Sequence, residues 1–234
     1  MKRVFNCFLI LALVSAPVWA RPLTTDDATI HGLGHWEGQV YDTVNTYKNA
    51  ISTNTIGVQI TNGILPNCDL KLEIPTFTSN VSGIGDAIIH TKYLFYQNGD
   101  NRLAARVDFK LPSGNAAAGL GSGYANYVLW LAGATKLGPV KVYKNLVYSS
   151  VGTAAGAPTA NYYQLSVAGE YPIDKWTAAS EIIWNNSVAP NVLTILVGGN
   201  YAITPAIVVD AGLTFGLTSQ SQPYVFTCGL TQNI

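Results

Sequence analysis

The sequence predicts an all-β protein, a closed antiparallel up-and-down transmembrane β-barrel of about 12 strands. Three observations support this prediction: polar and apolar residues alternate with period two, long and short connections alternate along the chain, and aromatic residues occur at both ends of apolar strand faces. Only 11% of the residues are charged, whereas ordinary soluble domains have about 25%. No segment after the amino terminus is long and apolar enough to be a membrane-spanning helix, and such a composition favours a barrel.

The first 20 residues have the pattern of a secretory signal peptide. Two cations precede an apolar run over residues 4–14, and Val18 and Ala20 stand at the positions that a signal peptidase reads. The run is shorter than the roughly 20 residues of a bilayer-spanning helix. We therefore expect cleavage after Ala20, so that residues 21–234 form an exported outer-membrane β-barrel domain.

Charge and cysteine content narrow the possible partners. Removal of Lys2 and Arg3 with the signal peptide leaves 11 basic residues against 13 acidic ones, a balance that argues against a nucleic-acid partner. The exported chain keeps Cys68 and Cys228. We expect both thiols to stay free, because the first falls in a predicted turn and the second on an outward strand face. Their spacing matches no metal motif, and we expect neither a metal nor a cofactor.

The hairpin over residues 85–111 shows the alternation most clearly. His90 and Lys92 share the parity of the first arm, whereas Ile89, Tyr93 and Phe95 occupy the other. Such a pattern has two meanings. In a soluble sandwich or lipocalin-like carrier the apolar face would form the core, and in a membrane barrel the apolar face meets lipid while the charges line the lumen.

The remaining strands follow in order. We predict strands over residues 34–46, 55–64, 70–77, 124–136, 140–150, 162–172, 176–186, 192–201, 206–217 and 224–231, in addition to the two arms of the hairpin. Between them the longer links are 48–54, 80–84, 113–123 and 152–160, and the shorter ones are 67–68, 98–101, 137–139 and 174–175. This alternation is typical of barrels with long external loops and short periplasmic turns.

Aromatic placement favours the membrane reading. Tyr163 and Tyr171 share the apolar face of one predicted strand, and Trp176 and Trp184 share that of the next. Each pair is separated by eight residues, about 20 Å along the membrane normal for a strand tilted by about 40°. We interpret the four rings as parts of an aromatic girdle at the two membrane interfaces, although packing in a soluble core is the alternative explanation.

Parity also gives a list of residues that would face the lumen and the solute path. Its charged members are Glu37, Lys71, Glu73, Asp86, His90, Lys92, Arg106, Asp108, Lys110, Lys136, Glu170, Glu181 and Asp210. Two registers of the central hairpin are possible, one with Lys92 opposite Asp108 and one with His90 opposite Asp108. For any single member, a purely structural role in filling the barrel remains the alternative to a role in transport.

No connecting segment is an obvious plug. The small, flexible stretch 113–123 is the best candidate for a loop folded over the mouth, and Asp26 and Asp27 are expected in a solvated approach to the first strand. The lumen of a 12-strand barrel is intermediate between the filled interior of about 8 strands and the open channel of 16 to 18.

Several short motifs resemble a known family. The segment RPLTTDDA at 21–28, Gly85-Asp86 with Lys92-Tyr93, and LPSG at 111–114 are similar to the outer-membrane family labelled MetA-pathway of phenol degradation. The similarity in layout covers nearly all of the exported chain. It implies a barrel-forming transporter with a proposed link to aromatic compounds.

These observations predict an outer-membrane channel or transporter that passes small solutes, with aromatic or hydrophobic compounds as candidates. We expect no catalytic residues and no enzymatic activity. His31, His35 and His90 are the available histidine bases, and none has a serine at a suggestive spacing. A barrel with a structural or surface role, a hydrolase at the barrel rim and a soluble carrier remain the alternatives. Lipid and a small solute are the expected partners.

Overall fold

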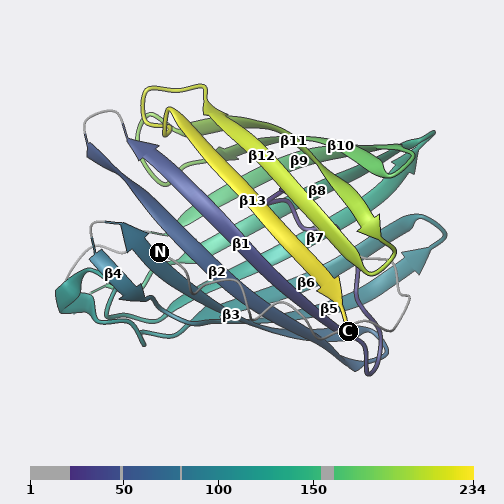
Figure 1. Ribbon diagram of the computed structural model, residues 1–234, viewed down its shortest axis with the longest axis horizontal. Helices are drawn as coiled ribbons and strands as arrows, with labels where there is room; N and C mark the ends of the chain where they lie inside the picture. Colours follow the sequence, from purple (N-terminus) through teal and green to yellow (C-terminus); the bar gives the residue numbers. More distant parts are fainter. Residues whose placement is uncertain (1–21, 48–49, 80, 154–160) are drawn as a thin grey trace, which may run out of the picture.

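The computed structural model describes residues 22–47, 50–79, 81–153 and 161–234, which form a closed barrel of strongly tilted strands (Figure 1). The predicted signal peptide lies outside the described residues. The strands are β1 (Trp36–Tyr47), β2 (Ala50–Leu65), β3 (Cys68–Ser79), β4 (Val81–Ile84), β5 (Ile88–Asn98), β6 (Asn101–Lys110), β7 (Asn126–Leu137), β8 (Val140–Ser150), β9 (Tyr162–Ile173), β10 (Trp176–Asn185), β11 (Val192–Thr204), β12 (Ile207–Gly216) and β13 (Tyr224–Asn233).

Twelve of these strands make the ring. Each is antiparallel to its neighbours, and the ring closes where β1 pairs with both β2 and β13. The short β4 folds back on β3 alone, and β5 takes the next place in the ring beside β3. The predicted fold class is therefore confirmed. Among the described residues, no helix is long and apolar enough to cross a membrane.

The first two of the longer predicted links differ from their predictions. Residues 48–54 were expected to form a long loop, but β1 and β2 extend to residues 47 and 50. Residues 81–84 were also expected to be a loop, and they form β4 instead. In both places polar and small residues that read as loop continue the sheet, because backbone pairing with a neighbouring strand outweighs their weak local preference.

Strand β9 shows which side chains point out of the barrel and which point into its lumen. Tyr163, Leu165 and Val167 are exposed, whereas Ser166 and Glu170 on the other face are buried. The same polarity holds around the ring, where leucine, valine and isoleucine rows point outward. A soluble sandwich or carrier would bury these rows. An apolar exterior on a closed ring of strands is the form that spans the outer membrane, and this is where the chain belongs, as predicted.

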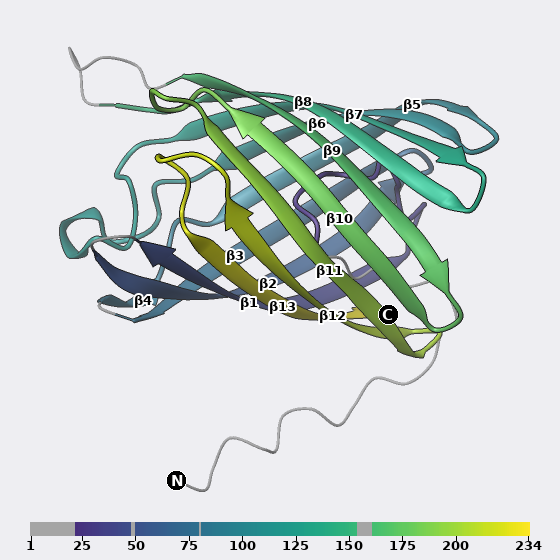
Figure 2. The same cartoon turned by 90° about the horizontal axis from the view of Figure 1, so that it is seen from above.

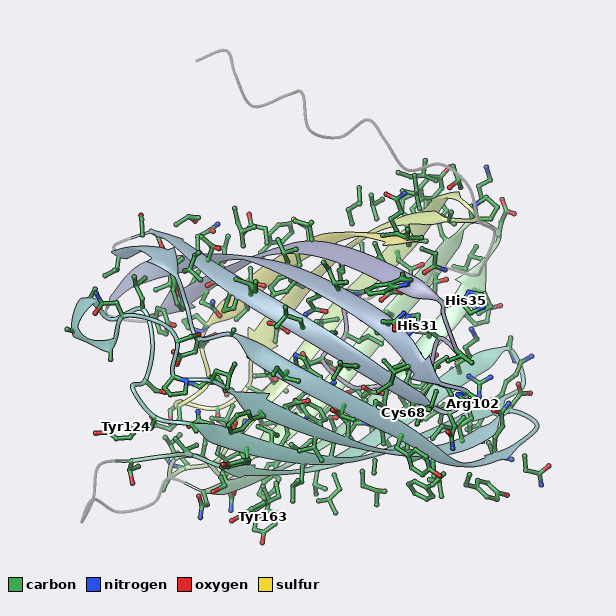
Figure 3. All side chains as sticks on the ribbon, turned by 90° about the horizontal axis from the view of Figure 1, so that it is seen from below. His31, His35, Cys68, Arg102, Tyr124 and Tyr163 are labelled. Carbon is green, nitrogen blue, oxygen red and sulfur yellow. The ribbon has the colours of Figure 1, made fainter. Side chains whose placement is uncertain are left out.

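The barrel has two distinct ends. The terminal end carries the start of β1, the end of β13 and the short turns, and the loop end carries the longer connections. Figure 3 shows His31, His35, Cys68 and Arg102 gathered at the terminal end and Tyr124 at the loop end, with Tyr163 pointing away from the barrel. Cys68 and Cys228 are both free thiols.

The four aromatic residues of the predicted girdle lie on the outer wall at both ends. Tyr163 and Trp184 are near the loop end, and Tyr171 and Trp176 are near the terminal end. Tyr163, Tyr171 and Trp176 are exposed and Trp184 is half-buried. Tyr148 and Tyr201 add neighbouring rings, with ring centroids 5.2 Å from Tyr163 and 4.6 Å from Trp176.

The interior contains a part of the chain that was not expected there. Residues 22–35, which we call the lumenal segment, run through the inside of the barrel before β1 begins (Figure 2). Ala28 is fully buried against Ala104 of β6 and Ala132 of β7. The expectation of a solvated approach to the first strand was therefore wrong.

Candidate functional site

Ion pairs hold the lumenal segment in the barrel. They form because the register of β5 and β6 places two cations side by side on the inner face. Lys92 lies directly opposite Arg106 in this pair, which brings two cations together on the inner face. Asp26 of the lumenal segment lies between them, with Oδ1 3.2 Å from Lys92 Nζ and Oδ2 3.1 Å from the Arg106 guanidinium. Asp27 adds a second carboxylate 3.6 Å from Lys92 Nζ. The segment therefore supplies the negative charge that this part of the wall lacks.

The pKa of Asp26 follows from these contacts. Burial by itself would raise it, because a charged carboxylate loses its hydration. The charges of Lys92 and Arg106 and the hydrogen bond from the amide of Ala28 outweigh burial and hold the pKa well below its ordinary value. Asp26 is therefore charged at neutral pH.

A second group of charges extends this network toward β3. The hairpin adopts the register with His90 opposite Asp108, one of the two predicted, because an irregularity between Leu94 and Tyr96 shifts the pairing. Asp108 accepts two hydrogen bonds from the guanidinium of Arg106, at 2.6 and 2.7 Å, and one of 2.8 Å from Trp130 Nε1. His90 contacts Asp108 at 2.7 Å through Nδ1.

Glu73 on β3 forms the other end of this network of charges and hydrogen bonds. It lies 3.2 Å from His90 Nε2 and accepts hydrogen bonds from the Tyr41 hydroxyl and from Gln59 Nε2, the latter at 2.8 Å. Lys71 Nζ donates to Gln59 Oε1 at 3.2 Å. Cations, anions and amides thus alternate across β1, β2, β3, β5 and β6, so that each buried charge has a compensating partner.

The other anchors of the lumenal segment lie across the barrel. Glu181 of β10 is 2% exposed and accepts hydrogen bonds from the backbone amides of Thr24 and Thr25. The Thr25 hydroxyl donates to Ser166 Oγ of β9 at 2.8 Å. On β8, Asn145 accepts from the amide of Asp26 at 2.6 Å and donates to its carbonyl at 3.0 Å. These bonds satisfy three amides and one carbonyl of a segment that crosses the lumen without pairing in a sheet.

His31 fastens the far end of the segment. Its Nδ1 lies 2.7 Å from Asp69 of β3 and its Nε2 lies 3.2 Å from Glu37 of β1. Burial by itself would lower the pKa of His31, but the hydrogen bonds to these two carboxylates outweigh burial and raise it to about 9. The imidazolium is therefore charged at neutral pH and bridges two strands.

A cavity of about 580 Å³ remains in the lumen beside the segment. Its wall contains seven carboxyl groups, three lysine or arginine side chains and all three histidines. The carboxyl groups belong to Asp26, Asp27, Glu37, Asp69, Glu73, Asp108 and Asp210, and the cations are Lys71, Lys92 and Arg106. With the protonated His31 counted among the cations, the carboxyl groups outnumber the cations by seven to four, so the cavity has a negative balance.

Most of the residues that parity assigned to the lumen lie at this cavity or on the segment. Eight of them line it: Glu37, Lys71, Glu73, His90, Lys92, Arg106, Asp108 and Asp210. Glu181 binds the segment directly. Glu170 is buried on the inner face of β9 and accepts a hydrogen bond of 2.8 Å from the Tyr143 hydroxyl, away from the cavity.

Three residues of that set lie at the barrel ends. Asp86 precedes β5, where its carboxylate accepts hydrogen bonds from the amides of Gly114 and Ser122 at 2.9 and 2.8 Å. Lys110 pairs with it at 3.3 Å. These bonds tie the loop 113–123 to the rim beside β4, where Leu120 packs close to Gly83. Lys136 is exposed beside the turn that follows β7.

Sequence reasoning did not find the partners on the segment itself. Asp26 and Asp27 were assigned to a solvated approach, and neither His31 nor Asp69 was in the lumen list. One signal was available in the sequence. Lys92 and Arg106 share the inner face of one hairpin, and in the observed register they require an anion from elsewhere. A segment with two adjacent acids just before the barrel is a natural source of it.

The histidines of the lumen contact charged partners. The ring nitrogens of His31 and His90 lie beside carboxylates, and His90 Nδ1 is also 3.3 Å from the Arg106 guanidinium. Among the described residues, no group of three or more histidine, cysteine or acidic side chains could hold a metal ion.

Comparison with known proteins supports the fold. The NanC porin structure matches with a TM-score of 0.63 at 10% identity, over 85% of this chain and 100% of that one. The KdgM porin in complex with disordered oligogalacturonate matches with a TM-score of 0.63 at 13% identity, over 85% and 99%. The β domain of the Bordetella autotransporter BrkA reaches 0.52 at 11% identity, over 86% and 100%.

Sequence comparison gives the family. No curated protein matches the chain. The family described as the MetA-pathway of phenol degradation matches residues 24–233, which include most of the lumenal segment and nearly the whole ring of strands. The chain therefore belongs to the family of the MetA-pathway of phenol degradation.

Proposed function

We propose that the chain forms a channel that passes small solutes across the outer membrane, with the lumenal segment narrowing the path. The cavity of about 580 Å³ between the segment and the wall carries this proposal. Small-molecule sites have volumes of about 300–1,000 Å³. A closed ring of strands with a polar interior and a space of this size is suited to a narrow, selective path rather than to a wide pore.

Small aromatic or hydrophobic compounds are the solutes that we propose. The family description refers to phenol degradation. In the cavity wall, Tyr41, Trp130 and Ile88 provide apolar surface among the charged groups. Trp130 is partly engaged, since the Arg106 guanidinium lies 4.3 Å from the centre of its ring.

The charge of the cavity argues against acidic solutes. The KdgM porin is described in complex with disordered oligogalacturonate, which is an acidic oligosaccharide. In the present chain seven carboxyl groups face three lysine or arginine side chains, and a negative wall repels anions. We therefore propose neutral or cationic solutes for this lumen.

Reconstitution tests the channel directly. Liposomes that contain the full exported chain should conduct ions and should swell in isotonic solutions of small neutral solutes. Changes of charge at Arg106 or Asp108 should alter the ion selectivity, because both side chains line the cavity. The absence of conductance and of swelling would leave a structural or surface role as the better explanation.

A reversible lock tests whether the segment narrows the path. The side chains of Thr25 and Ser166 meet with their oxygens 2.8 Å apart, so the double variant Thr25→Cys/Ser166→Cys, made with Cys68→Ser and Cys228→Ser, should form a disulfide. Locked channels should have the lower conductance, and reduction should restore it. The two single-cysteine variants are matched controls and should not respond to reductant. Equal conductance before and after reduction would show that release of this contact does not widen the path.

The enzymatic alternative has its own test. Esterase or protease activity of the refolded chain that disappears with His90→Ala would overturn the channel proposal as the main function. His35→Ala gives a matched comparison, because His35 lies at the exposed terminal end whereas His90 is buried in the charge network.

A further inference from the structure

Asp210 differs from every other acid in the cavity wall. Its side chain points inward from β12, the residue is 7% exposed, and Oδ2 has no hydrogen-bond partner among the described residues. The six other carboxyl groups of the wall each contact a cation or a hydrogen-bond donor: Asp26, Asp27, Glu37, Asp69, Glu73 and Asp108. A buried carboxylate without a partner is costly, so a proton or a cation must neutralise it.

The cations that line the cavity are already engaged. Lys92 lies within 3.2–3.6 Å of Asp26 and Asp27, and Arg106 holds Asp26 and Asp108. Lys71 donates to Gln59. If any of these three cations turned toward Asp210, a carboxylate or an amide would lose its partner. The cost of that loss keeps the cations at their present partners.

The glycines around Asp210 leave room for the carboxylate itself. Gly229 of β13 is its register partner, and a methyl group at residue 229 would lie 2.7 Å from Asp210 Oδ2. Two residues further along β12, Gly212 faces the lumenal segment, and a methyl group there would lie 2.8 Å from Cβ of Pro22. Glycine at these positions makes space for the carboxylate at residue 229 and for the start of the lumenal segment at residue 212.

We propose that Asp210 is the anchor for the cationic group of a small solute, which enters the cavity as an ammonium or a guanidinium. The proposal rests on the solute path proposed above and gives that path a chemical preference. The carboxylate provides two acceptor oxygens for a charge-assisted hydrogen bond. The negative balance of the wall favours cation entry, and Tyr41, whose register partner Gly229 is also that of Asp210, offers an aromatic ring near the same site.

Three probes of one size test the charge preference. Benzylamine, benzyl alcohol and benzoate share a ring and differ in charge, and binding to the full exported chain in detergent can be measured by titration calorimetry. We expect the order benzylamine, benzyl alcohol, benzoate from the tightest to the weakest. Asp210→Asn should weaken benzylamine binding by about tenfold or more, the loss expected when a buried charge partner is removed, and should leave benzyl alcohol unchanged.

Asp100→Asn is the matched control. It removes one carboxylate from an exposed turn outside the cavity wall, so it should leave benzylamine affinity unchanged. Equal affinity for the three probes, or equal loss of affinity in both variants, would overturn the proposal. Liposome swelling with a neutral solute is measured separately, so that failure of the channel and failure of the cation site remain distinguishable.

Arg21 is a cation of the chain itself that the test must take into account. Arg21 precedes Pro22 in the sequence and lies outside the described residues. The test therefore includes Arg21→Gln. Benzylamine binding by the unaltered chain that persists in this variant supports an anchor for solutes. If the unaltered chain does not bind benzylamine and Arg21→Gln does, the carboxylate serves the chain itself and the proposal is wrong.

Discussion

Two sides of the lumen differ in how their buried carboxylates are paired. On the side of β3, β5 and β6, Asp26 lies between the cations Lys92 and Arg106, and Asp108 pairs with Arg106, at distances of 2.6–3.2 Å. On the side of β12, Asp210 is as deeply buried, and no contact partner neutralises it among the described residues. The paired carboxylates of the first side have no need of another cation, whereas Asp210 on the second side can accept one.

The two sides of the lumen therefore have different roles: one holds the lumenal segment, and the other is proposed to bind a solute. The paired side fixes the lumenal segment in the barrel, because removal of Asp26 would leave two cations facing each other. The open side has no such structural task. If this comparison is right, substitutions of two buried aspartates should change stability in opposite directions, and the following predictions test it from the largest expected effect to the smallest.

Asp26→Asn should be the most disruptive substitution. It removes the negative charge between Lys92 and Arg106, and a buried charge that loses its partner costs about 3 kcal/mol. We expect a corresponding fall in the free energy of unfolding and a higher conductance, because the lumenal segment is no longer held. Denaturant unfolding in detergent and single-channel recording measure the two effects. Asp100→Asn should change neither, and equal behaviour of the two variants would refute the role of Asp26.

Glu181→Gln should have an intermediate effect. The carboxylate accepts hydrogen bonds from the amides of Thr24 and Thr25, and loss of its charge should cost about 2 kcal/mol. The first part of the segment should become accessible while the part near Asp26 stays fixed. Labelling of Thr25→Cys, at a position that is 2% exposed, and of Ala28→Cys, each combined with Glu181→Gln, measures this. Simultaneous release of both positions would mean that the segment has one anchor rather than several.

Alkaline pH should loosen the opposite end of the segment. Contacts with Asp69 and Glu37 raise the pKa of His31 to about 9 from its ordinary value of 6.5. A raised pKa means that the protonated form stabilises the fold: the contribution is complete below pH 6.5 and disappears as the pH rises through about 9. Thermal unfolding followed from pH 6 to 10 should show this loss, and His31→Gln should lack it. An unchanged profile in that variant would assign the transition to another group.

Asp210→Asn should have the smallest effect on stability and the opposite sign. No ion pair is lost, and the cost of burying an unpartnered carboxyl group becomes smaller, so the free energy of unfolding should stay equal or rise by about 1 kcal/mol. The same denaturant measurement as for Asp26→Asn makes the comparison direct. Destabilisation as large as that of Asp26→Asn would reveal a structural partner for Asp210 and remove the distinction between the two sides.

Much of the fold could be predicted because strand parity is a local property. Alternation along β5, β6 and β9 assigns each side chain to one face, and the apolar rows with aromatic ends point to lipid as their surroundings. The interior positions of His90, Arg106 and Asp108 follow from the same rule. The register of the hairpin did not follow, because the irregularity between Leu94 and Tyr96 depends on the pairing of two strands.

The sequence by itself determined the class of the protein: an exported chain with alternating strands, an apolar exterior and a charged interior, since these depend on composition and on a period of two residues. Only the tertiary structure decided that residues 22–35 lie inside the barrel and that Asp210 Oδ2 has no hydrogen-bond partner among the residues that the structure describes. Both depend on which charges meet across strands far apart in the chain. Asp26 reaches Lys92 and Arg106 over 66 and 80 residues of sequence, and no local pattern records a contact made at that distance.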